Sequence, residues 1–437
     1  MIQIIEHIYS LFLNCHQKIT TDTRKLEAGS IFFALKGDNF NANSFAINAI
    51  NAGCSYAIVD EEAVANNITI LYVQNVLETL QQLAKHHRSQ LTIPVIGITG
   101  SNGKTTNKEL IHAVLSKKYR TYATKGNLNN HIGVPLTLLA ITAQHEIAIV
   151  EMGANHQGEI ELLSSLSDPD FGLITNIGKA HLEGFGGEEG VKKGKSELYK
   201  HLKNKKGKIF INADDTILTS LCGDLDKITY GLSEAYDVHG ALMTNSEYVE
   251  FKWNAKHQLL DNSPIIKTHL FGHYNFINVL CAACIGNYFE VETTAINDAL
   301  AEYMPEMNRS QVKKTAHNTL ILDAYNANPS SMQLAIAHFI KQNFDSKLFI
   351  LGDMLELGDF AMAEHERILQ QLATNEIKQA VLVGPLFYEH KSHFPNYHFF
   401  KNCTEAESYL KNHIIKDTTV LIKGSRGIKL EKLVEYL

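Results

Sequence analysis

The chain has 437 residues, of which 45% are hydrophobic, and its formal net charge at pH 7 is -7. This length exceeds one ordinary hydrophobic core and predicts two or three domains. The acidic balance excludes a general attraction to nucleic acid, and we expect no nucleic-acid partner. No apolar run is long enough to span a bilayer, so we expect no membrane insertion. Six irregularly spaced cysteines indicate no disulfide framework and favour a cytoplasmic protein.

The first segment, residues 1–88, is predicted to form a small α/β domain. Residues 1–13 are typical of an amphipathic helix rather than a signal peptide, because they lack a basic start and carry charged side chains. Two strand-like runs follow at residues 30–35 and 55–60, each near a turn that contains glycine.

The second segment, residues 89–303, alternates buried-type strands with helical patterns, which predicts a central domain with a parallel sheet. Its strands are expected at residues 93–98, 147–151, 172–176 and 208–211. Residues 235–268 have strand-like pieces without helical periodicity between them. We therefore expect an antiparallel appendage there.

The third segment, residues 304–437, repeats the alternation of strand and helix. Strands are expected at residues 319–323, 348–351, 380–383 and 419–422, each followed by a helical pattern. This order predicts a doubly wound, Rossmann-like α/β domain.

The residues Gly97-Ile-Thr-Gly-Ser-Asn-Gly-Lys-Thr-Thr106 follow an apolar strand and favour a loop that binds a nucleoside triphosphate. Lys104 is suited to reach the terminal phosphates, and Thr105 is suited to hold Mg²⁺. The glycine spacing is unusual, because Ile98 stands where the common pattern has its first glycine. The alternative is a plain turn between a strand and a helix.

Three further positions are candidates for the same site. Glu151 ends a buried-type strand and is a candidate Mg²⁺ ligand. His181 follows the next strand and is expected in the same crevice, although an ordinary polar loop residue is the alternative. Lys195 follows Lys192 and Lys193 in a predicted helix, where neighbouring cations lower each other's pKa. A solvated basic helix face is the alternative for this lysine cluster.

Cys281 and Cys284 have the spacing of half a metal site. They lie in an apolar helical run without a second pair of ligands, so we expect them to pack in the core.

Four motifs, in this order, resemble the signature of the Mur ligases of peptidoglycan synthesis. They are Gly100-Ser-Asn-Gly-Lys-Thr-Thr106, Glu151-Met-Gly-Ala-Asn155, Asn176-Ile-Gly-Lys-Ala-His181 and Gly194-Lys-Ser-Glu197. Other blocks resemble the branch of the family that uses D-alanyl-D-alanine. They are Gly126-Asn-Leu-Asn-Asn130, Ile132-Gly-Val-Pro135, Asp323-Ala-Tyr-Asn-Ala-Asn-Pro329, Leu351-Gly-Asp-Met-Leu-Glu-Leu-Gly358 and Lys423-Gly-Ser-Arg426.

The resemblance implies a UDP-sugar-binding domain at residues 1–88, an ATP-binding domain at 89–303 and a ligase domain at 304–437. It implies ATP contacts at Gly100, Ser101, Asn102, Gly103, Lys104, Thr105, Thr106, Asn275, Asn278, Arg309, Asp323, Tyr325 and Asn326. It implies substrate contacts at Thr23, Arg24, Lys36, Gly37, Asn129, Asn130, Asn328, Ser425 and Arg426. It implies Mg²⁺ ligation by Thr105, Glu151, His181 and a carbamylated Lys195, with Lys104, Lys195 and His181 carrying catalysis.

The same resemblance implies the reaction. ATP activates the carboxylate of UDP-MurNAc-tripeptide as an acyl phosphate, and D-alanyl-D-alanine attacks it to form an amide. We expect a monomer. The alternatives are a sibling ligase that adds a single amino acid to a UDP-MurNAc-peptide or to folate, and an ATP-binding switch, which has no need for a carbamylated lysine.

Two positions depart from the family pattern. Asn41-Ala-Asn43 follows Phe40, where many members have Asp-Gly-His, and Asn308 replaces a common glycine before Arg309.

Overall fold

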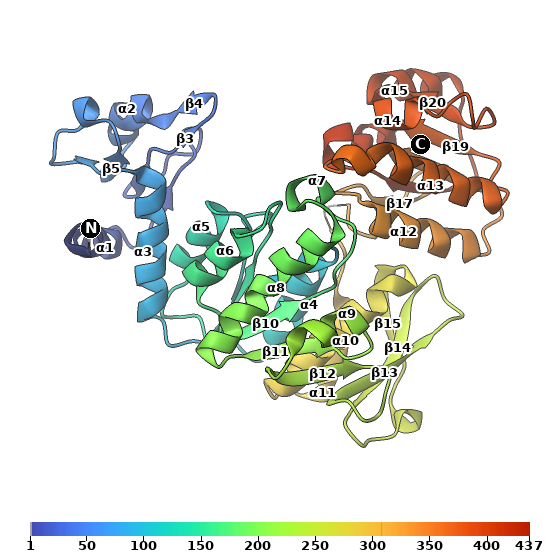
Figure 1. Cartoon of the computed structure of the whole chain (residues 1–437), viewed down its shortest axis with the longest axis horizontal. Helices are drawn as coiled ribbons and strands as arrows, with labels where there is room; N and C mark the ends of the chain where they lie inside the picture. Colours follow the sequence, from blue (N-terminus) through green and yellow to red (C-terminus); the bar gives the residue numbers. More distant parts are fainter. Residues whose placement is uncertain (1, 307) are drawn as a thin grey trace.

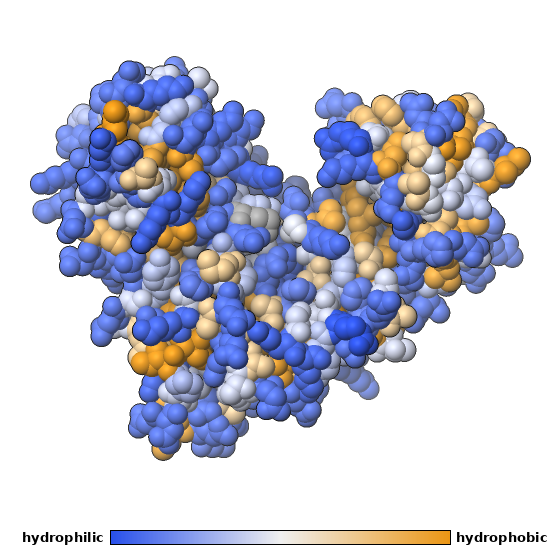
Figure 2. Space-filling model, turned by 180° about the vertical axis from the view of Figure 1, so that it is seen from behind, coloured by the Kyte–Doolittle hydropathy of each residue, from blue (hydrophilic) through white to orange (hydrophobic). Residues whose placement is uncertain are grey.

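The computed structural model describes residues 2–306 and 308–437, so the expectations that involve Met1 and Met307 lie outside the described residues. Three α/β units follow one another along the chain (Figure 1). The space-filling view from behind shows the surface hollowed between the first and third units (Figure 2). Among the described helices, none has the length and apolar character needed to cross a membrane.

The first unit has a four-stranded parallel sheet in the order β1-β2-β5-β6. Its strands are β1 (Ile19–Thr20), β2 (Ile31–Phe33), β5 (Tyr56–Val59) and β6 (Ile70–Tyr72). Its helices are α1 (Ile2–Asn14), α2 (Ala46–Asn51) and α3 (Val76–Gln90). A separate hairpin pairs β3 (Lys36–Gly37) with β4 (Phe40–Asn41). The amphipathic helix expected near the start is confirmed over the described residues.

Helix α3 joins the first unit to the second. Asn75 caps its start, because its side chain accepts a hydrogen bond from the backbone N–H of Glu78. At its other end the buried Arg88 donates to the carbonyls of Ser167 and Asp168 and pairs with Asp170 at 3.0 Å. These bonds satisfy a buried guanidinium and fix α3 against the central domain. The expected domain boundary at residue 88 falls inside this helix, and the division into domains stays a prediction.

The central unit has nine strands in the order β15-β14-β13-β12-β11-β10-β7-β9-β8. Its strands are β7 (Val95–Thr99), β8 (Thr121–Ala123), β9 (Ile147–Glu151), β10 (Phe171–Ile174), β11 (Lys208–Asn212), β12 (Asp226–Gly231), β13 (Val238–Met243), β14 (Tyr248–Ala255) and β15 (Ile266–Phe271). Its helices are α4 (Lys104–Leu115), α5 (Gly133–Leu139), α6 (Glu159–Ser167), α7 (Leu182–Phe185), α8 (Glu188–Lys205), α9 (Thr216–Cys222), α10 (Phe276–Tyr288) and α11 (Thr293–Glu302).

The strands from β8 to β13 pair in parallel, which confirms the expected parallel sheet. The expected antiparallel pairing is also confirmed, since β14 is antiparallel to β13 and to β15. These strands extend the central sheet and are not a separate appendage, because β13 pairs in parallel with β12.

The third unit has six strands in the order β16-β17-β21-β18-β19-β20, with only β16 antiparallel to its neighbour. Its strands are β16 (Gln311–Lys314), β17 (Thr319–Asp323), β18 (Lys347–Gly352), β19 (Ala380–Val383), β20 (His398–Phe400) and β21 (Thr419–Lys423). Its helices are α12 (Pro329–Lys341), α13 (Ala361–Thr374), α14 (Pro385–Tyr388) and α15 (Cys403–Asn412). The four expected strands are confirmed, and β16 and β20 are additional edge strands.

Candidate active site

The loop between β7 and α4 is shaped by two glycines with left-handed backbone. Gly100 has φ +143°, and a Cβ placed there would lie 2.0 Å from Oγ1 of Thr175. Gly103 has φ +75° directly before α4 begins at Lys104. Glycine is therefore required at these two positions, while Ile98 lies within β7 and packs in the core. The unusual spacing therefore places glycine at the two positions where the turn requires it. The N-terminus of α4 directly follows this turn.

Lys104 folds back over this loop. Its Nζ donates hydrogen bonds to the carbonyl of Gly100 at 2.7 Å and to that of Ser101 at 3.3 Å. Burial lowers the pKa of Lys104, and the carboxylate of Glu151 opposes that shift. The ammonium therefore has only carbonyl partners in the loop, and phosphate oxygens offer it a stronger, charged acceptor.

Glu151 ends β9 and is 1% exposed. Its Oε1 accepts from Oγ1 of Thr105 at 3.1 Å and from Nδ2 of Asn129 at 2.8 Å. Its Oε2 is buried and has no hydrogen-bond partner. A buried carboxylate oxygen without a partner, beside a threonine hydroxyl, is the donor set that suits a hard divalent cation. These residues therefore fit Mg²⁺.

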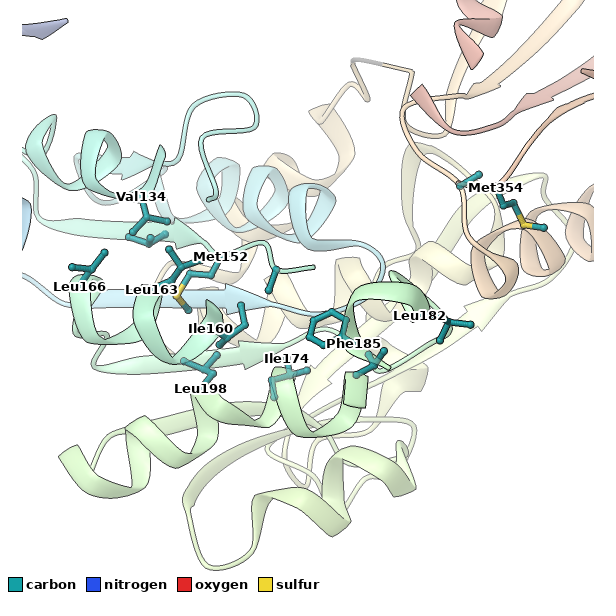
Figure 3. Close-up of a cluster of buried hydrophobic side chains, with 14 of the residues drawn as sticks. Val134, Met152, Ile160, Leu163, Leu166, Ile174, Leu182, Phe185, Leu198 and Met354 are labelled. Carbon is teal, nitrogen blue, oxygen red and sulfur yellow. The ribbon is translucent and has the colours of Figure 1, made fainter. Parts of the chain in front are cut away.

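Lys195, on α8, is completely buried. Its Nζ donates to the carbonyl of Ala154 at 3.2 Å and lies 5.0 Å from the ring centre of Phe185. Phe185 is the last residue of α7, and Figure 3 shows its ring in a cluster of buried apolar side chains. Gly194 makes this packing possible, because a Cβ there would lie 2.4 Å from the Phe185 ring.

Burial, and next the charge of Lys104, lower the pKa of Lys195 well below its usual range. The expectation that Lys192 and Lys193 cause this shift is wrong. Lys192 instead pairs with Glu189 at 2.5 Å, and Lys193 is exposed. The amine of Lys195 is thus biased toward its neutral form by its surroundings in the fold.

His181 lines the same cavity as Glu151, as expected. Its Nδ1 contacts the carboxylate of Glu356, which belongs to the third unit. The hydrogen bond to His181 lowers the pKa of Glu356. The imidazole therefore stands between the central domain and the third domain.

The third unit supplies one wall of the cavity. The guanidinium of Arg309 lies 3.7 Å from the ring centre of Tyr325, a cation–π contact. Asp323 accepts from Nζ of Lys423 at 2.5 Å, because β17 and β21 pair these two residues in register. The third unit therefore contributes both cationic and hydrogen-bond-accepting side chains to the cavity that the phosphate loop also lines.

Asn328 connects the third unit directly to the phosphate loop. Its Nδ2 donates to Oδ1 of Asn102 at 2.7 Å. Its own Oδ1 accepts from the N–H of Ser331 and caps α12. The start of α12 is therefore fixed against the loop.

Asn275 and Asn278 form a chain of amides on the other side of the loop. Nδ2 of Asn278 donates to Oδ1 of Asn275 at 2.9 Å, and Oδ1 of Asn278 accepts from Asn107 at 2.8 Å. Asn275 also donates to Oγ of Ser310, in the linker to the third unit. The amide groups of Asn275 and Asn278 could form hydrogen bonds with the polar edge of a bound base.

One cavity of about 710 Å³ gathers most of the predicted site. The predicted residues that line it are Ser101, Asn102, Gly103, Lys104, Thr105, Thr106, Asn129, Asn130, Glu151, His181, Asn275, Asn278, Arg309, Asp323, Tyr325, Asn326 and Asn328. Gly100 supplies the loop carbonyl that Lys104 contacts, and Lys195 lies behind Ala154, which lines the cavity.

Ser425 and Arg426 are not among the residues that line this cavity. Ser425 is buried, and its Oγ accepts from the N–H of Leu355 at 3.0 Å. Arg426 is exposed, with its guanidinium 5.4 Å from the Tyr325 ring centre.

The predicted residues of the first unit do not line this cavity. Lys36, in the β3–β4 hairpin, pairs with Asp60 at 2.9 Å and with Glu61 at 3.2 Å. Gly37 is its neighbour in the hairpin, and Thr23 precedes Arg24, which pairs with Asp22 at 2.9 Å.

Several polar residues of the site escaped the sequence reasoning. Lys108 is completely buried in α4, and its Nζ donates to the carbonyl of Thr124 at 2.6 Å. Glu356 and Lys423 stood inside quoted motifs without a role. Their partners are distant in sequence, so only the fold reveals them.

Cys281 and Cys284 are completely buried in α10, which confirms core packing. Among the described residues, no group of three or more histidine, cysteine, aspartate or glutamate side chains gathers as a metal site.

Comparison with known proteins gives the class. Family models described as "Mur ligase middle domain" and "Mur ligase, glutamate ligase domain" match residues 98–286 and 308–426. The chain is 36% identical over 434 residues to a UDP-N-acetylmuramoyl-tripeptide--D-alanyl-D-alanine ligase of Bacillus subtilis, covering 96% of this chain and 92% of that one. The corresponding ligase of Escherichia coli is 34% identical over 425 residues, with 96% and 93% covered.

A crystal structure of MurF from Acinetobacter baumannii matches with a TM-score of 0.85 and 32% identity, covering 96% of this chain and 92% of that one. The chain belongs to the Mur ligase family. It is an ATP-dependent ligase that forms an amide bond and releases ADP and phosphate.

Proposed function

We propose that this chain joins D-alanyl-D-alanine to UDP-MurNAc-tripeptide with the energy of ATP, in the synthesis of peptidoglycan precursors. The relatives of Bacillus subtilis and Escherichia coli are named for this reaction. The observation that carries the proposal is the joint presence of the phosphate loop, the partnerless oxygen of Glu151 and the buried amine of Lys195 around one cavity.

The first step joins two anions. A carboxylate oxygen of the tripeptide attacks the γ-phosphorus of ATP, the bond to the β–γ bridging oxygen breaks, and ADP leaves. Lys104 and Arg309 line the cavity and offset the charge repulsion between carboxylate and phosphate. The loop glycines allow backbone N–H groups to approach the phosphates.

The second step forms the amide. The amine of D-alanyl-D-alanine attacks the carbonyl carbon of the acyl phosphate, the C–N bond forms, and the C–O bond to phosphate breaks. The amine loses a proton in this step, and the leaving phosphate takes it up, so that HPO₄²⁻ is released. The third domain excludes water from the acyl phosphate, since Asn328 and Glu356 already bind across to the phosphate loop and to His181.

Thr105 and Glu151 would hold Mg²⁺, and His181 with carbamylated Lys195 would hold a second ion. When bound, Mg²⁺ supplies positive charge that stabilises the phosphoryl group during transfer. The fit rests on the buried Oε2 of Glu151, which has no partner in the protein.

Carbamylation of Lys195 has a physical basis in this chain. CO₂ reacts with a neutral amine, and burial lowers the pKa of this one. The product replaces a cation near Lys104 with an anion, and an anion is a suitable neighbour for Mg²⁺.

The site residues of the first domain complete the proposal. Thr23, Arg24, Lys36 and Gly37 would contact the UDP group, with Lys36 facing its phosphates. ATP as co-substrate and six free cysteines support a cytoplasmic reaction. We propose that the enzyme acts as a monomer, without nucleic acid and without insertion into a membrane.

The test is the product of the purified chain with ATP, Mg²⁺ and UDP-MurNAc-tripeptide. With D-alanyl-D-alanine, mass spectrometry should detect the pentapeptide product and one phosphate for each product molecule. Absence of that product, or equal product formation with a single amino acid, would refute the proposal and favour a sibling ligase.

A further inference from the structure

The loop of residues 124–130 lies beside the carboxyl end of β9 and is fixed at its start by Thr124. Oγ1 of Thr124 accepts from the N–H of Glu151 at 2.9 Å. The carbonyl of Thr124 accepts from Nζ of Lys108 at 2.6 Å, and both side chains are buried. A hydrogen bond from a buried ammonium to a carbonyl is stronger than one between neutral groups, and Lys108 also pairs with Glu109 at 2.7 Å, which holds the ammonium in place. The loop therefore begins at a rigid anchor next to Glu151.

The loop is fixed at its other end by Asn129. The carbonyl of Asn129 accepts from the N–H of Gly153 at 2.7 Å. A Cβ at Gly153 would lie 3.0 Å from Cγ of Asn129. The absence of a side chain at position 153 thus allows the Asn129 amide to approach the strand end. The loop closes on the segment that carries Glu151.

The amide of Asn129 makes the two oxygens of Glu151 different. Oε1 accepts from both Asn129 and Thr105, while Oε2 is buried without a partner. The terminal torsion of a glutamate side chain is broad, so without these donors the plane of the carboxylate could rotate away from this orientation. With Oε1 held, Oε2 is the oxygen left free for a ligand.

We propose that Asn129 is a positioning residue for the divalent cation. It holds Oε1 of Glu151, so that Oε2 is presented to Mg²⁺. This inference rests on the proposed function, because it requires a cation at Thr105 and Glu151. It assigns Asn129 to the metal site, whereas the motif resemblance implied a contact with substrate. Partners that orient a metal ligand commonly change metal affinity by about 10–100-fold when removed.

The experiment measures binding of Mn²⁺, as a paramagnetic substitute for Mg²⁺, to the whole chain with a non-hydrolysable ATP analogue. Electron paramagnetic resonance gives the free Mn²⁺ concentration. For Asn129→Leu we expect the Mn²⁺ dissociation constant to rise about tenfold or more. The KM for UDP-MurNAc-tripeptide should stay unchanged. Asn127→Ala is the matched control, because Asn127 is exposed in the same loop, and its Mn²⁺ affinity should equal that of the wild type.

A second variant guards against misfolding. Gly153→Ala keeps Asn129 but pushes against its amide, so the Mn²⁺ affinity should fall by a smaller factor than in Asn129→Leu. Unchanged Mn²⁺ affinity in both variants, with a raised KM for UDP-MurNAc-tripeptide, would overturn the positioning role and leave the proposed function intact. A wild-type chain that ligates but binds no Mn²⁺ with the analogue would overturn the cation site and this inference with it.

Discussion

The phosphate loop and the β3–β4 hairpin each present a lysine for which the motif resemblance implies a ligand contact, with ATP for Lys104 and with substrate for Lys36, yet the two lysines have opposite surroundings. Lys104 donates only to backbone carbonyls, and burial lowers its pKa. Lys36 is 42% exposed, and hydrogen bonds to Asp60 and Glu61 raise its pKa. The loop is thus shaped by backbone and glycine, whereas the hairpin is shaped by side chains that bind one another.

The side-chain network accommodates the two asparagines at which the first domain departs from the family pattern. Nδ2 of Asn41 donates to Glu61 at 2.8 Å, which a carboxylate at position 41 cannot do. Asn43 is completely buried, and its amide donates to Asp60 and accepts from the backbone of Asp60. The two asparagines therefore replace the common acidic and histidine residues within a consistent network. Side chains can change together in such a network, and a backbone-shaped loop has less freedom to change.

The largest effect should come from Lys195, which is completely buried behind the central site. Lys195→Ala removes the amine that CO₂ requires, and we expect ligation to fall about 10³-fold or more, as for the loss of a principal electrostatic group. Circular dichroism should show an intact fold. Partial recovery of activity with an added short-chain carboxylate is expected, because it replaces the lost negative group. Near-normal activity of the variant without additive would contradict the carbamate.

The second effect tests the backbone-shaped loop. Gly100→Ala places a Cβ 2.0 Å from Oγ1 of Thr175, at a left-handed φ of +143°. We expect nucleotide affinity to fall by about two orders of magnitude, because the loop must shift. Calorimetric titration with ADP measures this.

Gly126→Ala is the matched control for that variant. Gly126 also has a positive φ, +56°, but no atom lies within 4 Å of an added Cβ. Its cost should be limited to about 1 kcal/mol of backbone strain. Equal losses of ADP affinity in the two variants would indicate that general strain, and not the shape of the loop, sets nucleotide binding.

The third effect tests the side-chain network of the hairpin. Asn41→Asp restores the common acidic residue but places it beside Glu61, where like charges repel. We expect the KM for UDP-MurNAc-tripeptide to rise several-fold, on the order of 1 kcal/mol, with kcat unchanged. Glu61→Gln in the same chain should restore the KM, because a glutamine amide can donate to the new carboxylate. If neither change alters the KM, the side-chain network does not contribute to UDP binding.

The smallest expected effect is a pH dependence of the free energy of unfolding, caused by two buried histidines whose pKa, like that of Lys104, is lowered by burial. Burial lowers the pKa of His338 and of His365 to about 4, while their usual value is 6.5. Between these values the unfolded chain binds more protons, so stability should fall as pH drops from about 6.5 toward 4. The slope is at most about 1.4 kcal/mol per pH unit for each histidine.

Thermal melting between pH 7 and 5 measures this loss, and His338→Gln should flatten the curve. An unchanged slope in the variant would show that His338 is not one of the groups responsible.

The sequence predicted the buried strands well, because their apolar runs are long and flanked by clear turns. It predicted β9, β17 and β19 with the bounds that the structure has. In the central and third units it missed β8 and β20, which have three residues each, and β16, whose residues are largely polar and partly exposed. It also missed the internal strand β12, whose first two residues are exposed. Short edge strands bury little apolar surface and therefore leave a weak pattern.

The motifs predicted which residues line the site, but not the contacts between them. The pairing of Asp323 with Lys423 depends on strand register, and the contact of His181 with Glu356 depends on how two domains meet. The low pKa of Lys195 was expected from neighbours in the helix, yet its cause is burial against Phe185 and Ala154. Tertiary packing determines these features, and local sequence does not encode them.

The most direct test of the account follows oxygen from the tripeptide carboxylate. If the carboxylate attacks the γ-phosphorus, an oxygen atom of the tripeptide leaves with the released phosphate. UDP-MurNAc-tripeptide with a heavy oxygen isotope in both oxygens of its terminal carboxylate is incubated with the enzyme, ATP and D-alanyl-D-alanine, and the phosphate is analysed by mass spectrometry. The account predicts one labelled oxygen in each phosphate molecule. Phosphate without label, formed alongside the amide product, would contradict the acyl phosphate and the role given to this cavity.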